Sequence, residues 1–325
     1  MAQAAVILAQ GPTIDLHAHP GFFTAGELPL APLHQMQAAH VDAAFFSVVG
    51  DGPVIRREPR GLRNFRPPGA GELYQAALRQ CARIRGRAQA GYLKLLLEPG
   101  NIEAARHAHV PAALLAFEGG DALDGDPARV REFYALGMRS IQLMHYRVNE
   151  LGDIQTEPAQ HHRLTSAGEA IIAEMNRLGM IVDGAHAAPN TLRGMLDTSQ
   201  TPIIVSHTGP AALRTNARHL SDDLIRAVAA KGGVIGIWPL ARRGEESLAQ
   251  MLADIDYVRR LVGIDYVGIG TDMDGMSTFT VIPTYREFAP LPAALLSKGF
   301  SEAELHKLLG GNLMRVFEEV TSARG

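Results

Sequence analysis

The chain has 325 residues, of which 46% are hydrophobic and 20% are charged, and its formal net charge at pH 7 is -3. This apolar content supports a large buried core and excludes a mainly disordered chain. The slight negative charge, with no basic run interleaved with aromatic residues, excludes a nucleic-acid surface. A single cysteine, Cys81, excludes an intramolecular disulfide framework.

The first segment, residues 1–20, has a short apolar run but no basic stretch ahead of it. The run is too short to cross a bilayer, and the pattern is not that of a secretory signal. We therefore expect a cytoplasmic protein that does not associate with membranes, unless a leader has been removed.

Eight short apolar runs, most of them rich in β-branched residues, predict strands. They start near Thr13, Ala43, Ala112, Ser140, Met180, Pro202, Val234 and Tyr266. Helical patterns lie between most of them, and no repeat or linker marks a second domain. This alternation predicts one (β/α)8 TIM barrel domain spanning residues 1–325, of metal-dependent hydrolase type, rather than a doubly wound sheet.

The helical segments carry recognisable ends. Helices are predicted over 72–88, 127–136, 166–178, 246–262 and 301–317. Gly137 and Gly179 follow two of them as C-terminal caps. The patterns Ser166 to Glu169 and Ser301 to Glu304 predict capping boxes.

Two long polar segments interrupt the alternation. Residues 146–163 form a loop of a length that is usually functional in a compact domain. Five arginines are spread through a second segment, which is rich in proline and glycine: Arg56, Arg57, Arg60, Arg63 and Arg66. We expect this segment to form a solvated loop. The alternative is a lid over an anionic ligand.

Polar side chains follow the predicted strands at the ends where ligands bind in α/β barrels. They are His17, His19, Glu118, His145, His186, His207 and Asp272. Five of the 13 histidines therefore fall at the ends of four of the eight strands. Although a lone histidine in this position is usually a hydrogen-bonded loop residue, the whole set predicts a metal site.

The spacing of these residues predicts two metal ions. His17 and His19 alternate on an extended chain, so both imidazoles face one side and can bind the same ion. His186 and His207 come from adjacent strands and can bind a second ion, and the two oxygens of Glu118 can bridge the pair. Two ions about 3.5–4 Å apart convert a bridging water into a hydroxide nucleophile for amide or ester hydrolysis.

Two further residues at the rim have candidate roles in that chemistry. Asp272 is positioned to orient the hydroxide and pass its proton to the leaving group. His145 is positioned to stabilise the tetrahedral oxyanion.

These segments resemble the renal (membrane) dipeptidase family, peptidase family M19 of the amidohydrolase superfamily. The matching segments, in family order, are 15–20 (DLHAHP), 117–120 (FEGG), 136–145 (LGMRSIQLMH), 176–186 (NRLGMIVDGAH), 205–207 (VSH), 218–223 (RHLSDD), 267–275 (VGIGTDMDG) and 311–317 (GNLMRVF). No single segment is specific for this family, but the full set of segments, in family order across nearly the whole chain, is specific for it.

The resemblance implies a binuclear zinc dipeptidase with a small, dipeptide-like substrate. One Zn²⁺ is held by His17, His19 and Glu118, and the other by Glu118, His186 and His207. Asp272 is implied as the proton shuttle, His145 as the group that polarises the scissile carbonyl, and Arg218 as the group that binds the substrate carboxylate. For Arg218, an exposed surface charge is the competing interpretation. The family resemblance leaves a homodimer open.

Two departures from the family pattern affect the substrate more than the chemistry. The usual first motif is His-x-Asp, and here His19 replaces the carboxylate, which removes one negative charge but keeps a good zinc ligand. Trp238 stands where the family often has a tyrosine near the substrate carboxylate; core packing is the alternative role for Trp238. The alternatives to a dipeptidase are therefore an amidohydrolase of N-acyl amino acids or lactams, and a non-catalytic barrel that serves as a binding subunit.

Overall fold

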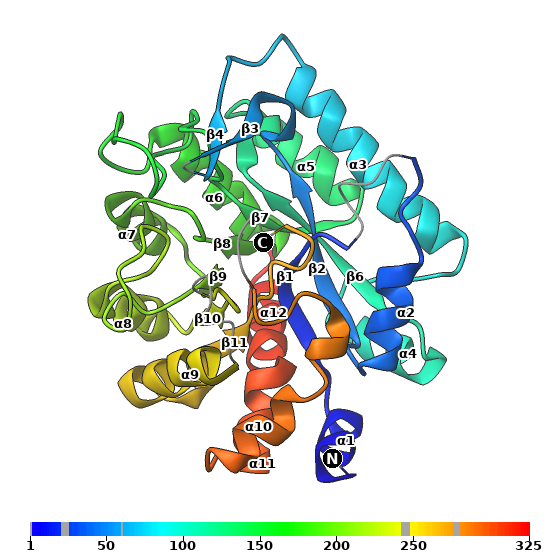
Figure 1. Ribbon diagram of the computed structural model, residues 1–325. Coiled ribbons are helices and arrows are strands. Elements are labelled where there is room, and N and C mark those ends of the chain that lie inside the picture. Colours follow the sequence, from blue (N-terminus) through cyan, green and yellow to red (C-terminus); the bar gives the residue numbers. More distant parts are fainter. Residues whose placement is uncertain (1, 21–25, 60, 242–247, 276–279) are drawn as a thin grey trace.

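The computed structural model describes residues 2–20, 26–59, 61–241, 248–275 and 280–325 (Figure 1). Eight parallel strands form the barrel wall in the order in which they occur along the chain. They are β1 (Ile14–Ala18), β2 (Ala43–Val49), β6 (Ala112–Glu118), β7 (Met138–Gln142), β8 (Ile181–Asp183), β9 (Ile203–Thr208), β10 (Val234–Ile237) and β11 (Val267–Ile269). The short strand β5 (Lys94–Leu95) also pairs with β6 but is not one of the eight strands of the barrel wall. The eight predicted strands and the barrel are confirmed.

The barrel closes between its first strand and the segment that follows its last. The backbone N–H of Asp272 donates to the carbonyl of His17 over 2.8 Å, and that of His19 donates to the carbonyl of Met273 over 2.7 Å. These bonds bring Asp272 beside the two histidines of β1.

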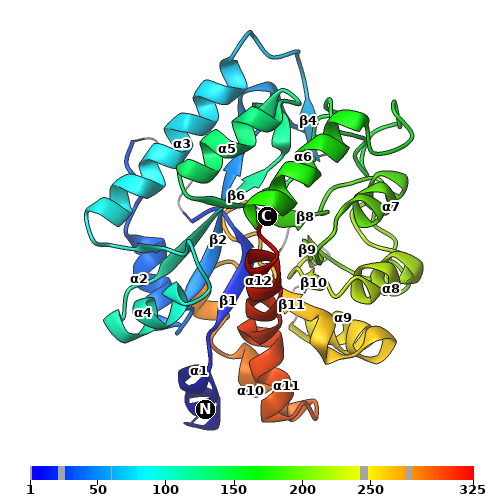
Figure 2. The ribbon, with the colours of Figure 1, turned by 180° about the vertical axis from the view of Figure 1, so that it is seen from behind.

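Helices surround the strands in both views (Figures 1 and 2). They are α1 (Ala2–Gln10), α2 (Ala31–Ala38), α3 (Glu72–Gln89), α4 (Asn101–Ala108), α5 (Pro127–Ala135), α6 (Ser166–Leu178), α7 (Pro189–Thr198), α8 (Asp222–Ala230), α9 (Leu248–Val262), α10 (Leu291–Ser297), α11 (Glu302–His306) and α12 (Asn312–Ser322). Within the described part of the chain, no helix combines the length and the hydropathy that crossing a membrane requires.

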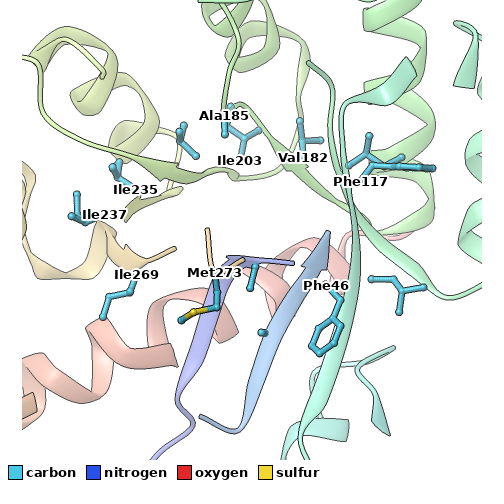
Figure 3. Packing of buried hydrophobic residues seen from close by; sticks show 14 of the residues in the cluster. Phe46, Phe117, Val182, Ala185, Ile203, Ile235, Ile237, Ile269 and Met273 are labelled. Atoms are coloured by element: carbon cyan, nitrogen blue, oxygen red, sulfur yellow. The ribbon is translucent and has the colours of Figure 1, made fainter. Parts of the chain in front are cut away.

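Side chains alternate between the two faces of the barrel wall, and this alternation separates two buried layers. Along β2, Phe46 belongs to the large outer cluster under the helices, which Figure 3 shows together with Phe117 and Ile203. Phe45 points the other way, into a smaller cluster that includes Phe317 of α12. Ser47 follows on the same face as Phe45, which places its hydroxyl inside the barrel below the rim.

One predicted helix end differs from the structure, one lies outside the described residues, and one is confirmed. The helix α6 is capped by Thr165, whose side chain accepts from the backbone N–H of Gly168, so the prediction of a capping box at Ser166 is wrong. The predicted start at Glu246 lies outside the described residues, and α9 is described from Leu248. The capping box of Ser301 with Glu304 is confirmed.

The arginine-rich segment is a hairpin rather than a plain solvated loop. The strands β3 (Ile55–Glu58) and β4 (Gly61–Asn64) pair antiparallel and form a separate two-stranded sheet at the top of the molecule in Figure 1. Arg66 anchors its base, because its guanidinium donates to both oxygens of Glu72 over 2.7 and 2.5 Å. Arg60 lies outside the described residues.

Cys81 is expected to be unreactive in the folded protein. Its side chain is buried in α3, and this burial raises the pKa of the thiol to about 12. Because the thiolate is the reactive form, a disulfide thiol reagent should label Cys81 only after denaturant is added. Rapid labelling without denaturant would contradict the packing described for α3.

Candidate metal centre

The first ligand group consists of His17, His19 and Asp272, which lie on the two sides of the barrel closure, and Glu118 at the end of β6. The Nε2 atoms of His17 and His19 lie 3.2 Å apart, and each lies 3.2 Å from one oxygen of Glu118. Oδ1 of Asp272 lies 3.3 Å from His19 Nε2 and 3.8 Å from His17 Nε2. Asp272, expected as a proton shuttle, is therefore also within reach of the ion that this group would bind.

The second ligand group consists of Glu118, His186 and His207. The Nε2 atoms of the two histidines lie 3.1 Å apart, and they lie 3.4 and 3.7 Å from Oε1 of Glu118. Glu118 ends β6, between the two groups, so its two oxygens belong to both. The structure thus brings the five predicted metal ligands together as two groups that share one carboxylate.

The spacing of these atoms fits zinc. A tetrahedral site with bonds of about 2.0–2.1 Å separates neighbouring ligand atoms by about 3.3 Å, close to most of the distances above. Serine hydroxyls lie within hydrogen-bond distance of two Nδ1 atoms: that of Ser47 is 3.2 Å from His17, and that of Ser206 is 3.0 Å from His207. With Nδ1 occupied in this way, Nε2 is left to present its lone pair to an ion.

Burial and charge favour a cation at both groups. Burial and the neighbouring Arg218 hold the pKa of His186 well below its usual range, so its imidazole stays neutral and able to bind metal. Burial alone would lower the pKa of His19, but the carboxylates of Glu118 and Asp272 raise it to about 10. The same carboxylates that hold a proton there would attract a metal ion in its place.

Buried aspartates below the rim hold the ligand-bearing strand ends together. Asp15 accepts from the backbone N–H of Thr271 over 2.8 Å and from the hydroxyl of Tyr285 over 3.0 Å, which joins β1 to the segment after β11. Asp183 accepts from the backbone N–H of Ser206 over 3.0 Å, which joins β8 to β9. These bonds fix the strand ends from which the two pairs of histidines project.

Two of the site residues have backbone conformations that non-glycine residues rarely adopt. The φ angles of His186 and Asp272 are 65° and 52°. Such conformations cost about 1–3 kcal/mol each and persist where the surrounding structure holds them, often at functional sites.

His145 lies beside the two ligand groups and is oriented by Asp51, a residue that was not predicted as part of the site. Its Nε2 is 3.2 Å from Oε2 of Glu118, and its Nδ1 is 2.6 Å from Oδ1 of Asp51. Asp51 also accepts from the backbone N–H of Tyr146 over 3.0 Å. The sequence Gly50-Asp51-Gly52 predicts only a turn, and Asp51 was not predicted as a site residue, although it lies two positions after the end of β2, at the same rim as the other site residues.

Replacing Asp51 by Asn is expected to lower kcat by roughly 10- to 100-fold, the usual cost of losing a residue that orients an active-site histidine. The amide would no longer hold the Nδ1 proton of His145 as strongly. Metal content should stay at the wild-type value, because Asp51 belongs to neither ligand group. Unchanged kcat in this variant would show that the contact is only structural.

A cavity of about 550 Å³ opens onto the metal centre. This volume falls within the range of roughly 300–1,000 Å³ that is typical of small-molecule sites. Its walls include Tyr146, Arg218 and Trp238, and Arg56, Arg57 and Arg63 of the hairpin also line it.

Arg218 is buried in the cavity wall, so the surface-charge interpretation is wrong. Its side chain donates to Gln155 over 3.2 Å and to the carbonyl of His207 over 3.4 Å, and its guanidinium carbon lies 5.3 Å from the ring centre of Trp238. Its Nη1 is buried without a hydrogen-bond partner among the described residues. A buried donor without a partner is costly, which suggests that a bound ligand supplies the acceptor.

The fold and the two ligand groups define a (β/α)8 barrel of the metal-dependent hydrolase class. Comparison with known proteins identifies the family: the model of the membrane dipeptidase family, peptidase family M19, matches residues 1–325. The chain belongs to this family.

Individual relatives agree with this assignment. The chain is 35% identical to Dipeptidase aclJ of Aspergillus oryzae over 217 aligned residues. This alignment covers 64% of this chain and 51% of the length of that protein. It is 32% identical to human Dipeptidase 3 over 224 aligned residues, which make up 66% of this chain and 46% of the human protein. The matches thus span about half the length of these curated relatives. The crystal structure of the probable dipeptidase PvdM from Pseudomonas aeruginosa has the same fold, with a TM-score of 0.84 and 18% sequence identity. The superposition covers 99% of this chain and 98% of that chain.

Proposed function

We propose that this protein is a binuclear zinc-dependent hydrolase that cleaves the amide bond of dipeptides or dipeptide-like compounds. The observation that carries the proposal is the pair of ligand groups sharing Glu118 at the end of the barrel that faces the cavity. Membership of the membrane dipeptidase family, and the dipeptidases among its relatives, support the choice of reaction.

The ligand assignment follows from the two groups. His17, His19 and Glu118, with Asp272 in reach, would hold one Zn²⁺, and Glu118, His186 and His207 would hold the other. When bound, zinc acts as a Lewis acid toward a carbonyl oxygen and lowers the pKa of water to about 7. The replacement of the family's aspartate by His19 keeps a ligand of the kind that zinc prefers.

The protein's own residues then position the substrate and move protons. Asp272 would take the proton of the attacking water and deliver it to the leaving amine. With Asp51 bound at Nδ1, His145 would donate from Nε2 to the oxygen of the scissile carbonyl as negative charge develops on it. Arg218, with its unpartnered Nη1, would bind the terminal carboxylate of the substrate.

Replacing Arg218 by Lys is expected to raise KM for dipeptides by about tenfold and to change kcat less, because lysine keeps the charge but loses the planar fork that binds a carboxylate. A dipeptide amide, which lacks the carboxylate, provides the matched control and should be hydrolysed equally well by both proteins. Equal losses on the acid and the amide would mean that Arg218 has a structural role instead.

A panel of L,L and L,D dipeptides, N-acyl amino acids and lactams tests the reaction itself. Turnover of a dipeptide by zinc-loaded protein is the expected result. Turnover confined to the acylated amino acids or lactams would favour the second candidate function, an amidohydrolase of those compounds. The observation that favours this candidate is Trp238, which lines the cavity and stands where the family often has a tyrosine. No turnover of any of these compounds would favour a binding subunit. The single domain, the homodimer and the cytoplasmic location stay predictions.

A further inference from the structure

The β3–β4 hairpin adds a basic wall to the cavity, away from the residues assigned above. The cavity touches Glu118 and Asp272 at one end, and it is also lined by Ile55, Arg56, Arg57, Leu62 and Arg63 of the hairpin. The antiparallel register places Arg56 opposite Arg63 and Arg57 opposite Leu62. Three arginines of one small hairpin thus line a site for which neither the metal centre nor Arg218 requires them.

Two of these arginines form ion pairs, and one of the pairs joins the hairpin to another segment. Arg63 donates to Glu157 of the segment 146–163 over 2.6 Å, which joins the hairpin to another segment that lines the cavity. Arg56 donates to Glu58 within its own strand over 3.1 and 3.0 Å. Both guanidinium groups are therefore matched by a carboxylate.

Arg57 differs from these two neighbours. It is exposed, and within the described part of the chain its guanidinium has neither an ion pair nor a hydrogen bond. The hairpin wall therefore carries one uncompensated positive charge. A charge lining a cavity with low-dielectric walls acts on a bound ligand more strongly than the same charge on an open surface.

We propose that Arg57 forms a subsite for an anionic group on the substrate, the side-chain carboxylate of an acidic residue in a dipeptide. This proposal rests on the proposed function, because it identifies the ligand as part of the same substrate. The guanidinium offers parallel N–H donors that match a carboxylate. The pairs Arg63–Glu157 and Arg66–Glu72 keep the hairpin over the cavity, so little ordering of the backbone is needed when the carboxylate binds.

Isosteric substrate pairs test the subsite on zinc-loaded protein. Ala-Glu is compared with Ala-Gln, and Glu-Ala with Gln-Ala, in wild-type protein, in Arg57→Gln, and in Arg193→Gln as a control for an exposed arginine of α7 outside the cavity. In at least one pair, we expect the wild-type kcat/KM for the acid to exceed that for its amide by about tenfold, a preference typical of one charge-assisted contact.

The Arg57→Gln variant should lose this preference while it hydrolyses the amide substrates at the wild-type rate, and Arg193→Gln should keep it. An acid-to-amide ratio near one in the wild type for both pairs, or an unchanged ratio in Arg57→Gln, would overturn the proposal. If no dipeptide is hydrolysed, the proposed function fails. Calorimetric binding of Ala-Glu and Ala-Gln to the wild type and to Arg57→Gln then decides the subsite, and equal affinities would reject it.

Discussion

Replacing Glu118 by Gln is expected to abolish binuclear metal binding and to lower kcat/KM by about 10³-fold or more, which corresponds to about 4 kcal/mol of transition-state stabilisation. The two oxygens of Glu118 lie 3.2 to 3.7 Å from the Nε2 atoms of the four histidines proposed as ligands, so both ligand groups depend on this carboxylate. A neutral amide offers one weaker ligand oxygen and no negative charge to balance two cations.

Metal analysis of the purified variant, together with hydrolysis assays, measures this effect. Glu318→Gln, on the exposed face of α12, makes the same chemical change away from the site and should keep full metal content and activity. If Glu118→Gln retains two ions per chain, Glu118 does not bridge them and the binuclear assignment is wrong.

Replacing Asp272 by Asn is expected to lower kcat by roughly 10²- to 10⁴-fold, the range for the loss of a general acid–base group. The amide cannot take or deliver a proton. Because Oδ1 of Asp272 also lies 3.3 Å from His19 Nε2, the affinity for the first ion should fall as well. At saturating zinc, His17, His19 and Glu118 should still hold this ion.

The two effects separate when kcat is measured as a function of zinc concentration. We expect kcat to stay low at the highest zinc concentration, where metal content is restored. Recovery of wild-type kcat at high zinc would make Asp272 a metal ligand only. Asp197→Asn, on the exposed face of α7, is the matched control.

The barrel and the grouping of the candidate metal ligands were predictable because both depend on short-range sequence patterns. Most strands contain a compact apolar run, and chemistry in this fold gathers at the strand ends, so His186 and His207 identify the rim without knowledge of their contacts. The His-x-His pattern likewise places the imidazoles of His17 and His19 on one side.

What the sequence left open depends on contacts between residues far apart in the chain. Asp51 orients His145, 94 positions later, and nothing in its local turn pattern points to that partner. The hairpin pairs Arg63 with Glu157 at the edge of the long segment 146–163, also over 94 positions. The burial of Arg218 likewise depends on the long segment 146–163, whose Gln155 it contacts.

Zinc content per chain, measured on protein purified without chelators and paired with dipeptide hydrolysis before and after metal removal, tests the central claim most directly. We predict two zinc ions per chain, loss of turnover on removal, and recovery when zinc is added back. A chain that binds no metal even with added zinc, or one that hydrolyses dipeptides equally well without it, would contradict the account.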